Sequence, residues 1–390
     1  MRVTIVSPYD PRPAPGGDPL GLRGGVEEAL DRCASGLAAR GHDVTIVCSA
    51  PSDAVATDAD GVRVVRVRRR GALFRVPLAP LWRHVPADAQ LVHVPATYPG
   101  VSDAIPWRER RSGRAVVVDH HFDVQGTSLA MRAAAALHGA TLARAELAAT
   151  RVVCKSADYA ARSPFLSRVP RERLDVVPNG VDVDAFPLSQ RRTPDILCVG
   201  RLVPYKGVHT LLAAMPRIHA ETGARLTVVG DGPERARLHT LAARLRAPVH
   251  FRGRVTAAEL PILYGSHRLT ILPSANGQEA FGIALLESMA TGTPVVASDL
   301  PGVREVASLA GAVAPANDAE ALARAVVRAW REPRAFGSPG EIRARVAERY
   351  AWPRVLDALE AVYARALDEA ASKRALAAPS RIRAPAGGGA

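Results

Sequence analysis

Residues 196–207 read Ile-Leu-Cys-Val-Gly-Arg-Leu-Val-Pro-Tyr-Lys-Gly, and this stretch decides how the chain folds. Four consecutive apolar residues predict a buried strand over 196–199. A turn follows, and apolar residues then recur at helical spacing, which predicts a helix over 207–220. A continuously apolar strand that leads directly into a helix is typical of a parallel sheet with both faces covered.

The same alternation continues in both directions along the chain. After this stretch, strands are expected at 226–229, 249–251, 269–272 and 295–297, and helices at 234–245, 256–264, 282–290 and 318–331. Before it, strands are expected at 3–7, 44–48, 62–67, 91–94, 115–118, 152–154 and 174–177, with helices at 26–40 and 127–149. Two open α/β units of this kind bind ligands in the cleft at the carboxyl ends of their strands.

These segments predict an α/β fold with two doubly wound, Rossmann-like domains facing a cleft. The polar, proline-containing segment 185–194 is expected to link an N-terminal domain over 1–184 to a C-terminal domain over 185–350. A last helix over 351–372 carries Leu356, Leu359 and Tyr363 at helical spacing. The remaining residues, 373–390, end in Ala-Pro-Ala-Gly-Gly-Gly-Ala and are expected to be a disordered tail.

The composition is that of a globular protein with a strong excess of positive charge. The 390 residues include 48% hydrophobic and 23% charged side chains, and the formal net charge is +13. Of the 51 basic residues only three are lysine. Cations are spread along the whole chain, aromatic residues make up only 5%, and no nucleic-acid-binding motif is present, so we expect no nucleic-acid partner. An arginine bias of the genome and an anionic substrate or membrane surface both stay open as explanations.

Compartment and metal content follow from what the sequence lacks. No apolar run approaches the roughly 18 residues that a membrane span needs. The first residues lead straight into a strand without a signal peptide. Four cysteines are scattered with no Cys-x-x-Cys spacing, which predicts a reduced, cytoplasmic protein without a structural metal.

The first candidate site is the pair Arg201 and Lys206, five residues apart where a strand passes into a helix. A helix start already favours anions. A guanidinium binds phosphate in a bidentate manner and an ammonium adds a point charge, so this pair predicts a clamp for a diphosphate. The alternative is a solvated pair of cations at a strand exit.

The second candidate is the segment from Glu279 to Glu287. Free backbone amides of Phe281, Gly282 and Ile283 are expected where the helix begins, and they suit a diphosphate. The two carboxylates would accept hydrogen bonds from sugar hydroxyls. Taken alone, the segment would be better explained by an acid at a helix start and a second, solvated acid within the helix, but it does not stand alone.

Gly24 and Gly25 precede the first long helix. Their lack of side chains allows backbone amides to approach an anion or a sugar. A flexible entry into the helix is the alternative interpretation.

Asp119, His120 and His121 follow directly after the strand at 115–118, where polar groups are well placed for a site. Adjacent histidines project differently, so at most one of them is expected to face the cleft. Zinc is not expected, because no other histidine or cysteine has suitable spacing.

Two further motifs do not support a metal or a cofactor. Asp182 and Asp184 form an Asp-x-Asp pair, but they start the connection between the domains, and we expect no metal there. The run from Gly230 resembles a dinucleotide fingerprint, yet Arg235 occupies the position of its third glycine. The sequence therefore predicts neither a metal nor a cofactor.

Taken in order, these motifs resemble those of the retaining GT-B glycosyltransferases of family four, also called glycosyl transferases group 1. The resemblance covers roughly residues 1–370. It rests on Gly-Gly-Val-Glu at 24–27, Arg-Gly-His-Asp-Val-Thr at 40–45, Val-Pro-Asn-Gly-Val-Asp at 177–182, Gly-Arg-Leu-x-x-x-Lys-Gly at 200–207, Val-Val-Gly-Asp-Gly-Pro-Glu at 228–234, Phe-Arg-Gly-x-Val at 251–255, Pro-Ser at 273–274, the two glutamates at 279 and 287, and Gly-Thr-Pro-Val-Val-Ala at 292–297.

The resemblance implies a GT-B fold with an acceptor-binding N-terminal domain, a nucleotide-sugar-binding C-terminal domain and a last helix that crosses back to the N-terminal domain. By motif, Arg201 and Lys206 would bind the donor diphosphate, and Glu287 would bind the ribose hydroxyls. Glu279 would bind hydroxyls of the donor sugar.

Further donor contacts follow from the same resemblance. Amides at Phe281, Gly282 and Ile283 would assist Glu279, Gly24 and Gly25 would approach the phosphate or the acceptor, and Arg254 would lie near the base. His121 matches the family's histidine near the reaction centre, although His120 stays open as the alternative. The proline- and glycine-rich segment 8–25 departs from the family pattern on the acceptor side.

The activity implied is metal-independent transfer of a hexose-type sugar, with retention, from a UDP or GDP sugar to a hydroxyl acceptor. No carboxylate nucleophile is evident, so similarity favours same-face substitution, in which the leaving phosphate helps to deprotonate the acceptor. The acceptor could be lipid-linked, an oligosaccharide or a natural product. A GT-B sugar-nucleotide epimerase and a non-catalytic nucleotide-sugar-binding protein are the alternatives.

The segment 66–75 and the run Leu81-Trp82-Arg83 mix cations with bulky apolar side chains. Such a mixture suits peripheral contact with anionic lipid on the inner face of the cell membrane. A solvated strand edge is the alternative.

Overall fold

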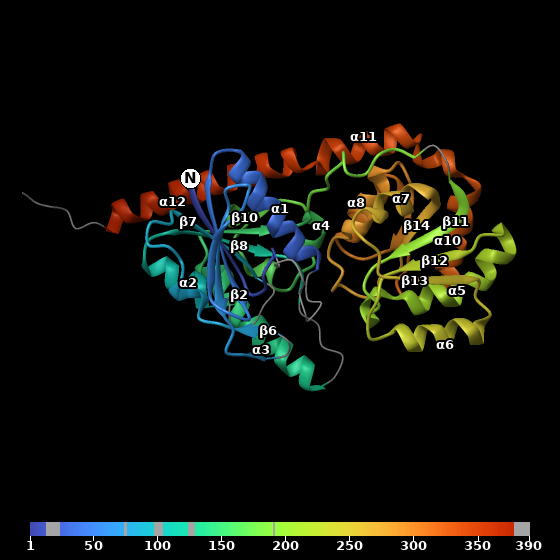
Figure 1. Cartoon of the computed structure of the whole chain (residues 1–390), viewed down its shortest axis with the longest axis horizontal. Coiled ribbons are helices and arrows are strands. Elements are labelled where there is room, and N and C mark those ends of the chain that lie inside the picture. The colour runs from blue at the N-terminus through green and yellow to red at the C-terminus, as the bar shows by residue number, and fades with distance from the viewer. Residues whose placement is uncertain (13–23, 74–75, 97–103, 124–128, 190–191, 378–390) are drawn as a thin grey trace, which may run out of the picture.

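The computed structural model describes residues 1–12, 24–73, 76–96, 104–123, 129–189 and 192–377. Figure 1 shows two α/β domains side by side, with the helices α11 (Pro339–Tyr350) and α12 (Trp352–Ala377) running along one edge of both. The predicted α/β architecture of two domains built on parallel sheets is confirmed.

The N-terminal sheet has eight strands in the order β10-β9-β8-β7-β1-β2-β4-β3, and all neighbours are parallel except β3 and β4. Its strands are β1 (Arg2–Ser7), β2 (Asp43–Ala50), β3 (Ala54–Thr57), β4 (Arg63–Arg68), β7 (Leu91–Pro95), β8 (Ala115–His120), β9 (Arg151–Cys154) and β10 (Leu174–Val176). The helices that accompany it are α1 (Gly25–Ala39), α2 (Ala104–Arg111), α3 (Leu129–Ala148) and α4 (Ala157–Ala160).

The C-terminal sheet has six parallel strands in the order β13-β12-β11-β14-β15-β16. They are β11 (Thr193–Val199), β12 (Leu226–Val229), β13 (Val249–Gly253), β14 (His267–Leu272), β15 (Val295–Ser298) and β16 (Gly311–Ala314). Its helices are α5 (Val208–Thr222), α6 (Arg235–Leu245), α7 (Glu259–Ser266), α8 (Ile283–Ala290), α9 (Val303–Ala307) and α10 (Ala319–Arg331). The predicted boundary at 184/185 falls between β10 and β11.

The last helix crosses back to the N-terminal domain, as the resemblance implied. Leu356, Leu359 and Tyr363 of α12 are at most 5% exposed and join the core formed by β1, β2 and α1. Because α12 packs in this core and α11, which directly precedes it, packs in a core of the C-terminal domain, the two helices link the domains. The helix continues to Ala377 and therefore extends past the expected end at 372. The rest of the expected tail lies outside the described residues.

Several elements were not predicted. The edge strand β3 is fully exposed and pairs only with β4, so it lacks the apolar run of a buried strand. The short hairpin of β5 (Gly71–Leu73) and β6 (Val76–Leu78) stands apart from both sheets. α2, α9 and α11 were also missed. α11 begins with a capping box in which Ser338 and Glu341 satisfy each other's backbone amides.

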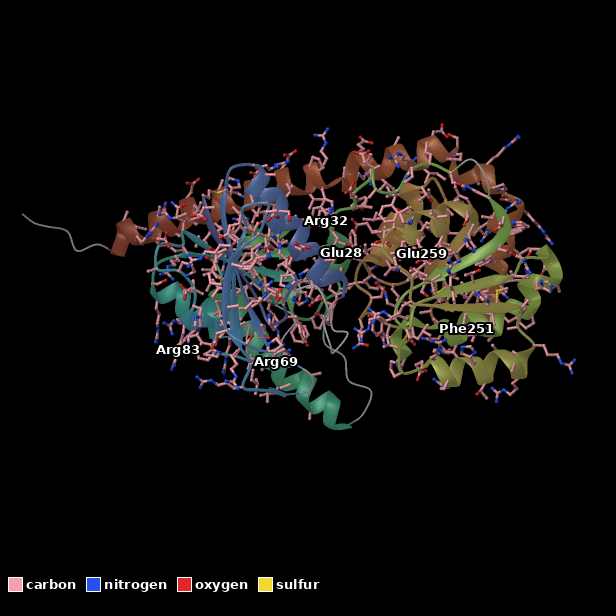
Figure 2. All side chains as sticks on the ribbon, viewed as in Figure 1. Glu28, Arg32, Arg69, Arg83, Phe251 and Glu259 are labelled. Atoms are coloured by element: carbon pink, nitrogen blue, oxygen red, sulfur yellow. The ribbon has the colours of Figure 1, made fainter. Side chains whose placement is uncertain are left out.

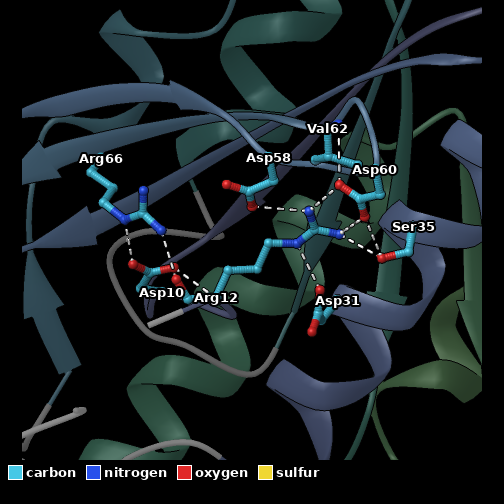
Figure 3. A network of polar contacts seen from close by, with 8 residues as sticks. All are labelled: Asp10, Arg12, Asp31, Ser35, Asp58, Asp60, Val62 and Arg66. Atoms are coloured by element: carbon cyan, nitrogen blue, oxygen red, sulfur yellow. Dashed lines mark hydrogen bonds and ion pairs between the residues drawn. The ribbon is translucent and has the colours of Figure 1, made fainter. Parts of the chain in front are cut away.

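Arg12 anchors the loop that follows β1 (Figure 3). Its guanidinium lies 2.7 Å from Asp31 on α1 and 3.1 and 2.8 Å from Asp58 and Asp60, in the turn between β3 and β4. Burial opposes the charge, but the hydrogen bonds that Arg12 donates to Asp60 and Asp58 hold the pKa of Arg12 above its usual value. Hydrogen bonding to Arg12 in turn lowers the pKa of Asp60 to about 2. This network fixes the chain just before the segment 13–23, which lies outside the described residues.

Candidate functional site

Glycines at two strand exits let backbone pack directly on backbone in the C-terminal domain. Gly207 has φ +65°, and a Cβ there would lie 1.9 Å from the carbonyl oxygen of Pro273. Gly230 has φ +131°, and a Cβ there would lie 2.0 Å from the oxygen of Gly200. No side chain fits at either position. The exits of β11, β12 and β14 are therefore brought to one place, at the carboxyl edge of the sheet.

A cavity of about 510 Å³ opens between the exits of β11, β12 and β13. Arg201 and Arg254, both predicted donor ligands, are exposed and line it. Within the described residues, neither guanidinium has a carboxylate partner. The remaining lining residues are Val199, Gly200, Val229, Gly230, Asp231, Gly232, Pro233, Val255 and Leu260.

Lys206 and Glu279, predicted from separate motifs, are in direct contact. Lys206 Nζ lies 2.5 Å from Glu279 Oε2, which also accepts a hydrogen bond from Ser274 at 3.1 Å. Burial works against the ammonium, but the carboxylate of Glu279 raises the pKa of Lys206 above its usual value. The lysine is therefore charged and held in place by a carboxylate that is itself only 9% exposed.

The start of α8 offers unpaired donors. Gly282 caps the helix with φ +86° and ψ 63°, in the left-handed region. The amides of Phe281, Gly282 and Ile283 donate no hydrogen bond to another described residue. These are the three amides expected from the sequence, and they lie two to four residues after Glu279. A helix start with free amides binds anions readily.

Glu287 lies within α8 and faces the N-terminal domain. It accepts a 2.7 Å hydrogen bond from Tyr264, and burial raises its pKa to about 7. A cavity of about 40 Å³ next to it is also lined by Gly25 and Glu28 of α1. A Cβ at Gly25 would lie 3.0 Å from Ile283 of α8. Gly25 therefore allows the two domains to approach closely beside Glu287. Gly24 precedes the helix as its N-cap.

The two adjacent histidines have different surroundings. His120 is 1% exposed, and its two ring nitrogens lie 2.5 Å from Glu146 and 3.0 Å from Asp123. Burial alone would lower the pKa of His120, but the carboxylates of Asp123 and Glu146 outweigh burial and raise that pKa to about 9. His121 has Nε2 3.3 Å from Asp119. Its Nδ1 forms no hydrogen bond within the described part of the chain. Only His121 therefore has a nitrogen left for a ligand.

Sequence reasoning missed the residues that support the site from behind. Tyr264 contacts Glu287 and Glu28 faces it, but neither belongs to a recognisable spacing. Ser274, which donates to Glu279, belongs instead to the Pro-Ser motif at 273–274. Lys155 carried a signal, because it is one of only three lysines in the chain. The structure places it 2.7 Å from Asp119.

Models of known protein families match the chain over both domains. The model of Glycosyltransferase Family 4 matches residues 23–185, and that of Glycosyl transferases group 1 matches residues 193–332. The phosphatidyl-myo-inositol mannosyltransferase of Mycolicibacterium smegmatis is 27% identical over 362 residues, which are 84% of each chain. The glycogen synthase of Mycobacterium tuberculosis H37Rv is 34% identical over 181 residues, 41% of this chain and less than half (43%) of that protein.

Solved structures show the same fold. Sucrose-phosphate synthase from Thermosynechococcus elongatus superposes with a TM-score of 0.76 at 23% identity, over 93% of this chain and 98% of that one. Anabaena Alr3699/HepE, solved in complex with UDP, superposes with a TM-score of 0.71 at 18% identity, over 93% and 100%. No helix among the described residues is long and apolar enough to cross a membrane. The chain belongs to family four of the GT-B glycosyltransferases and is a glycosyltransferase.

Proposed function

We propose that this glycosyltransferase moves a hexose-type sugar, with retention, from a UDP or GDP sugar to a hydroxyl acceptor. The carrying observation is the cavity at the carboxyl edge of the C-terminal sheet, where Arg201 and Arg254 have no carboxylate partner among the described residues. Unpaired cations at such an edge suit a nucleoside diphosphate. The HepE structures with UDP and with UDP-glucose concern a protein of the same fold.

In this proposal, the diphosphate lies between Arg201, Lys206 and the amides at the start of α8. Glu279 orients the donor sugar through its hydroxyls, and the ion pair with Lys206 fixes the position of the Glu279 carboxylate. Glu287 accepts hydrogen bonds from the ribose, and Arg254 lies beside the base. His121 presents its free nitrogen to the donor sugar.

The chemistry follows from where charge develops. Breaking the anomeric C–O bond leaves negative charge on the departing diphosphate, and Arg201, Lys206 and the α8 amides stabilise it electrostatically. The acceptor hydroxyl then attacks the same face of the sugar, and the leaving phosphate takes up its proton. Glu279 is paired with a lysine, so it serves to orient the sugar rather than to attack it. This is the metal-independent substitution expected from the family.

The acceptor side of the proposal includes peripheral contact with an anionic membrane. Arg69 and Arg83 lie at the same edge of the N-terminal domain (Figure 2), and Arg68 and Arg70 beside them are exposed. Arg66, in contrast, lies 2.6 Å from Asp10. The apolar partner expected nearby, Leu81, is fully buried, so the contact would be electrostatic. Sedimentation with anionic vesicles at low salt tests it, and no binding there would refute it.

A thermal-shift screen tests the donor. UDP-glucose or GDP-mannose should raise the melting temperature, because a ligand present at 100 times its dissociation constant stabilises a protein by about 2.7 kcal/mol. Arg201→Ala should abolish the shift. Arg324→Ala, on the exposed face of α10, is the matched control and should keep it. Equal shifts in both variants would refute the placement of the diphosphate.

A further inference from the structure

A buried polar cluster lies behind His121, at the carboxyl ends of β7, β8 and β9. Its centre is the Oδ2 atom of Asp119, which lies 2.7 Å from Lys155 Nζ, 3.3 Å from His121 Nε2 and 3.4 Å from His93 Nε2. The other nitrogen of His93 lies 2.8 Å from the hydroxyl of Tyr363 on α12. All five residues are at most 7% exposed.

The charges of this cluster are fixed by its surroundings. Burial opposes the ionisation of Asp119, but His121 and Lys155 hold the pKa of its carboxyl well below the usual value. Burial lowers the pKa of His121, and Lys155 lowers it further against the pull of Asp119. On α1, burial raises the pKa of the Cys33 thiol to about 12. At neutral pH Asp119 is therefore a carboxylate and His121 is neutral.

An ionised carboxylate only accepts hydrogen bonds, and this sets the proton on each ring. His121 Nε2 lies 3.3 Å from Asp119 Oδ2 without the alignment of a hydrogen bond. A lone pair on Nε2 would be repelled by the carboxylate at this distance, so the proton is on Nε2 and Nδ1 keeps its lone pair. His93 Nε2, 3.4 Å from the same oxygen, carries a proton for the same reason, and its Nδ1 forms the 2.8 Å hydrogen bond with the Tyr363 hydroxyl. The rings of His121 and His93 are therefore oriented in the same way around Asp119. The hydroxyl next to His93 Nδ1 is that of Tyr363, on the crossover helix α12.

We propose that Asp119 is a positioning residue that holds His121 in the Nε2–H tautomer, with Lys155, His93 and Tyr363 holding Asp119 in turn. His121 then offers Nδ1 as an acceptor to a hydroxyl of the donor sugar. The role of His121 toward the sugar rests on the proposed function, whereas the tautomer does not. Through Tyr363, the α12 helix that closes the core also reaches the reacting end of the N-terminal domain.

Burying charged side chains in such a cluster costs free energy of folding. Replacing a buried ion pair by well-packed apolar side chains is often neutral or stabilising. A role confined to stability would therefore not require a carboxylate that two histidines share. Fixing a tautomer does require one, because an amide at position 119 could donate as well as accept.

Histidine ¹⁵N NMR on the full-length protein tests the proposal without any substrate. The wild type should show His121 as the Nε2–H tautomer alone at pH 7. Asp119→Asn should give a mixture of tautomers. Asp123→Asn, which removes a partner of His120 instead, should leave His121 unchanged and is the matched control. An Nδ1–H tautomer or an imidazolium in the wild type would overturn the proposal, and that measurement needs no variant to fold.

Two further variants test the supporting residues. Tyr363→Phe removes only one hydroxyl and should give His93 a mixture of tautomers. Lys155→Met removes a cation and should raise the pKa of His121 in an NMR titration. Unchanged spectra in both variants would overturn the roles of these residues.

Turnover measurements connect the cluster to the reaction. Asp119→Asn should lower kcat at least tenfold with little change in the KM for the sugar nucleotide that the thermal-shift screen selects. If the wild type showed the expected tautomer but no transfer of sugar, the proposed function would fail while the positioning of His121 stood. An unchanged kcat in Asp119→Asn would refute the positioning role in catalysis.

Discussion

Glu287→Gln should stabilise the protein at alkaline pH and weaken donor binding at the same time. Glu287 is held by Tyr264 in a largely buried place, and burial raises its pKa from 4.5 to about 7. A carboxyl whose pKa is raised by folding binds its proton more tightly in the folded state. Stability is then greatest below pH 4.5 and is lost as the pH rises to 7. An isosteric amide cannot ionise and avoids this loss.

The magnitude follows from the pKa. One unit is worth about 1.4 kcal/mol, so a rise from 4.5 to about 7 costs the wild type roughly 3 kcal/mol at pH 8. For a domain of this size, each kcal/mol shifts the melting temperature by about 2–4 °C. Glu287→Gln should therefore melt roughly 6–12 °C higher than the wild type at pH 8. The difference should become small near pH 5.

Melting curves at pH 5, 6, 7 and 8 provide the assay, with circular dichroism as the signal. Glu348→Gln, an exposed glutamate on α11, is the matched control and should follow the wild type at every pH. Donor binding provides the second test. Glu287→Gln should bind the sugar nucleotide more weakly, because the amide lacks the charge to which ribose hydroxyls would donate. Parallel curves for wild type and Glu287→Gln from pH 5 to 8 would refute the reasoning.

Three other substitutions have expected outcomes. Gly207→Ala would place Cβ 1.9 Å from the oxygen of Pro273; it should remove the thermal shift with sugar nucleotides, and an unchanged shift would contradict the close packing at this glycine. Arg12→Met leaves three carboxylates facing one another and should cost about 3–5 kcal/mol in urea unfolding. Because Arg12 lowers the pKa of Asp60 from 3.8 to about 2, the wild type should lose this stability as the pH falls through that range, whereas the variant lacks the contribution and should lose less stability there. Leu356→Ala should cost about 2–5 kcal/mol; a smaller loss in urea unfolding would show that α12 contributes little to the N-terminal core.

The sequence was sufficient for the parts of the fold in which local and tertiary preferences agree. Strands β1, β7 and β12 are mainly apolar and lie in parallel sheets, and each lies within one or two residues of its predicted limits. The exposed strand β3 has no such run, because its pairing with β4 is set by the neighbouring strand. The other strands could be predicted from the sequence because burial on both faces makes them mainly apolar.

For the site, spacing identified residues but not their partners. Arg201 and Lys206 were expected to act as one clamp, yet the structure separates their surroundings. Arg201 faces a cavity, whereas Lys206 is bound to Glu279, which lies 73 positions later in the sequence. A contact across that distance depends on how β11 and β14 pack side by side in the sheet. No local pattern encodes it.

The hydrogen bonds that arginines make to the backbone help to explain the net charge of +13. Many arginines act as donors to backbone carbonyls: Arg343 bonds the end of α8, Arg345 bonds two loop carbonyls, and Arg173 bonds the end of α3. A guanidinium has five donors and can bridge several carbonyls at once, which an ammonium does less well. Such arginines are engaged by the fold through part of their donors. Arg201 and Arg254 differ because they line a cavity and have no carboxylate partner among the described residues. We therefore propose that the donor side of this protein is marked by cations that both line a cavity and lack a carboxylate partner, a combination that the total charge does not reveal.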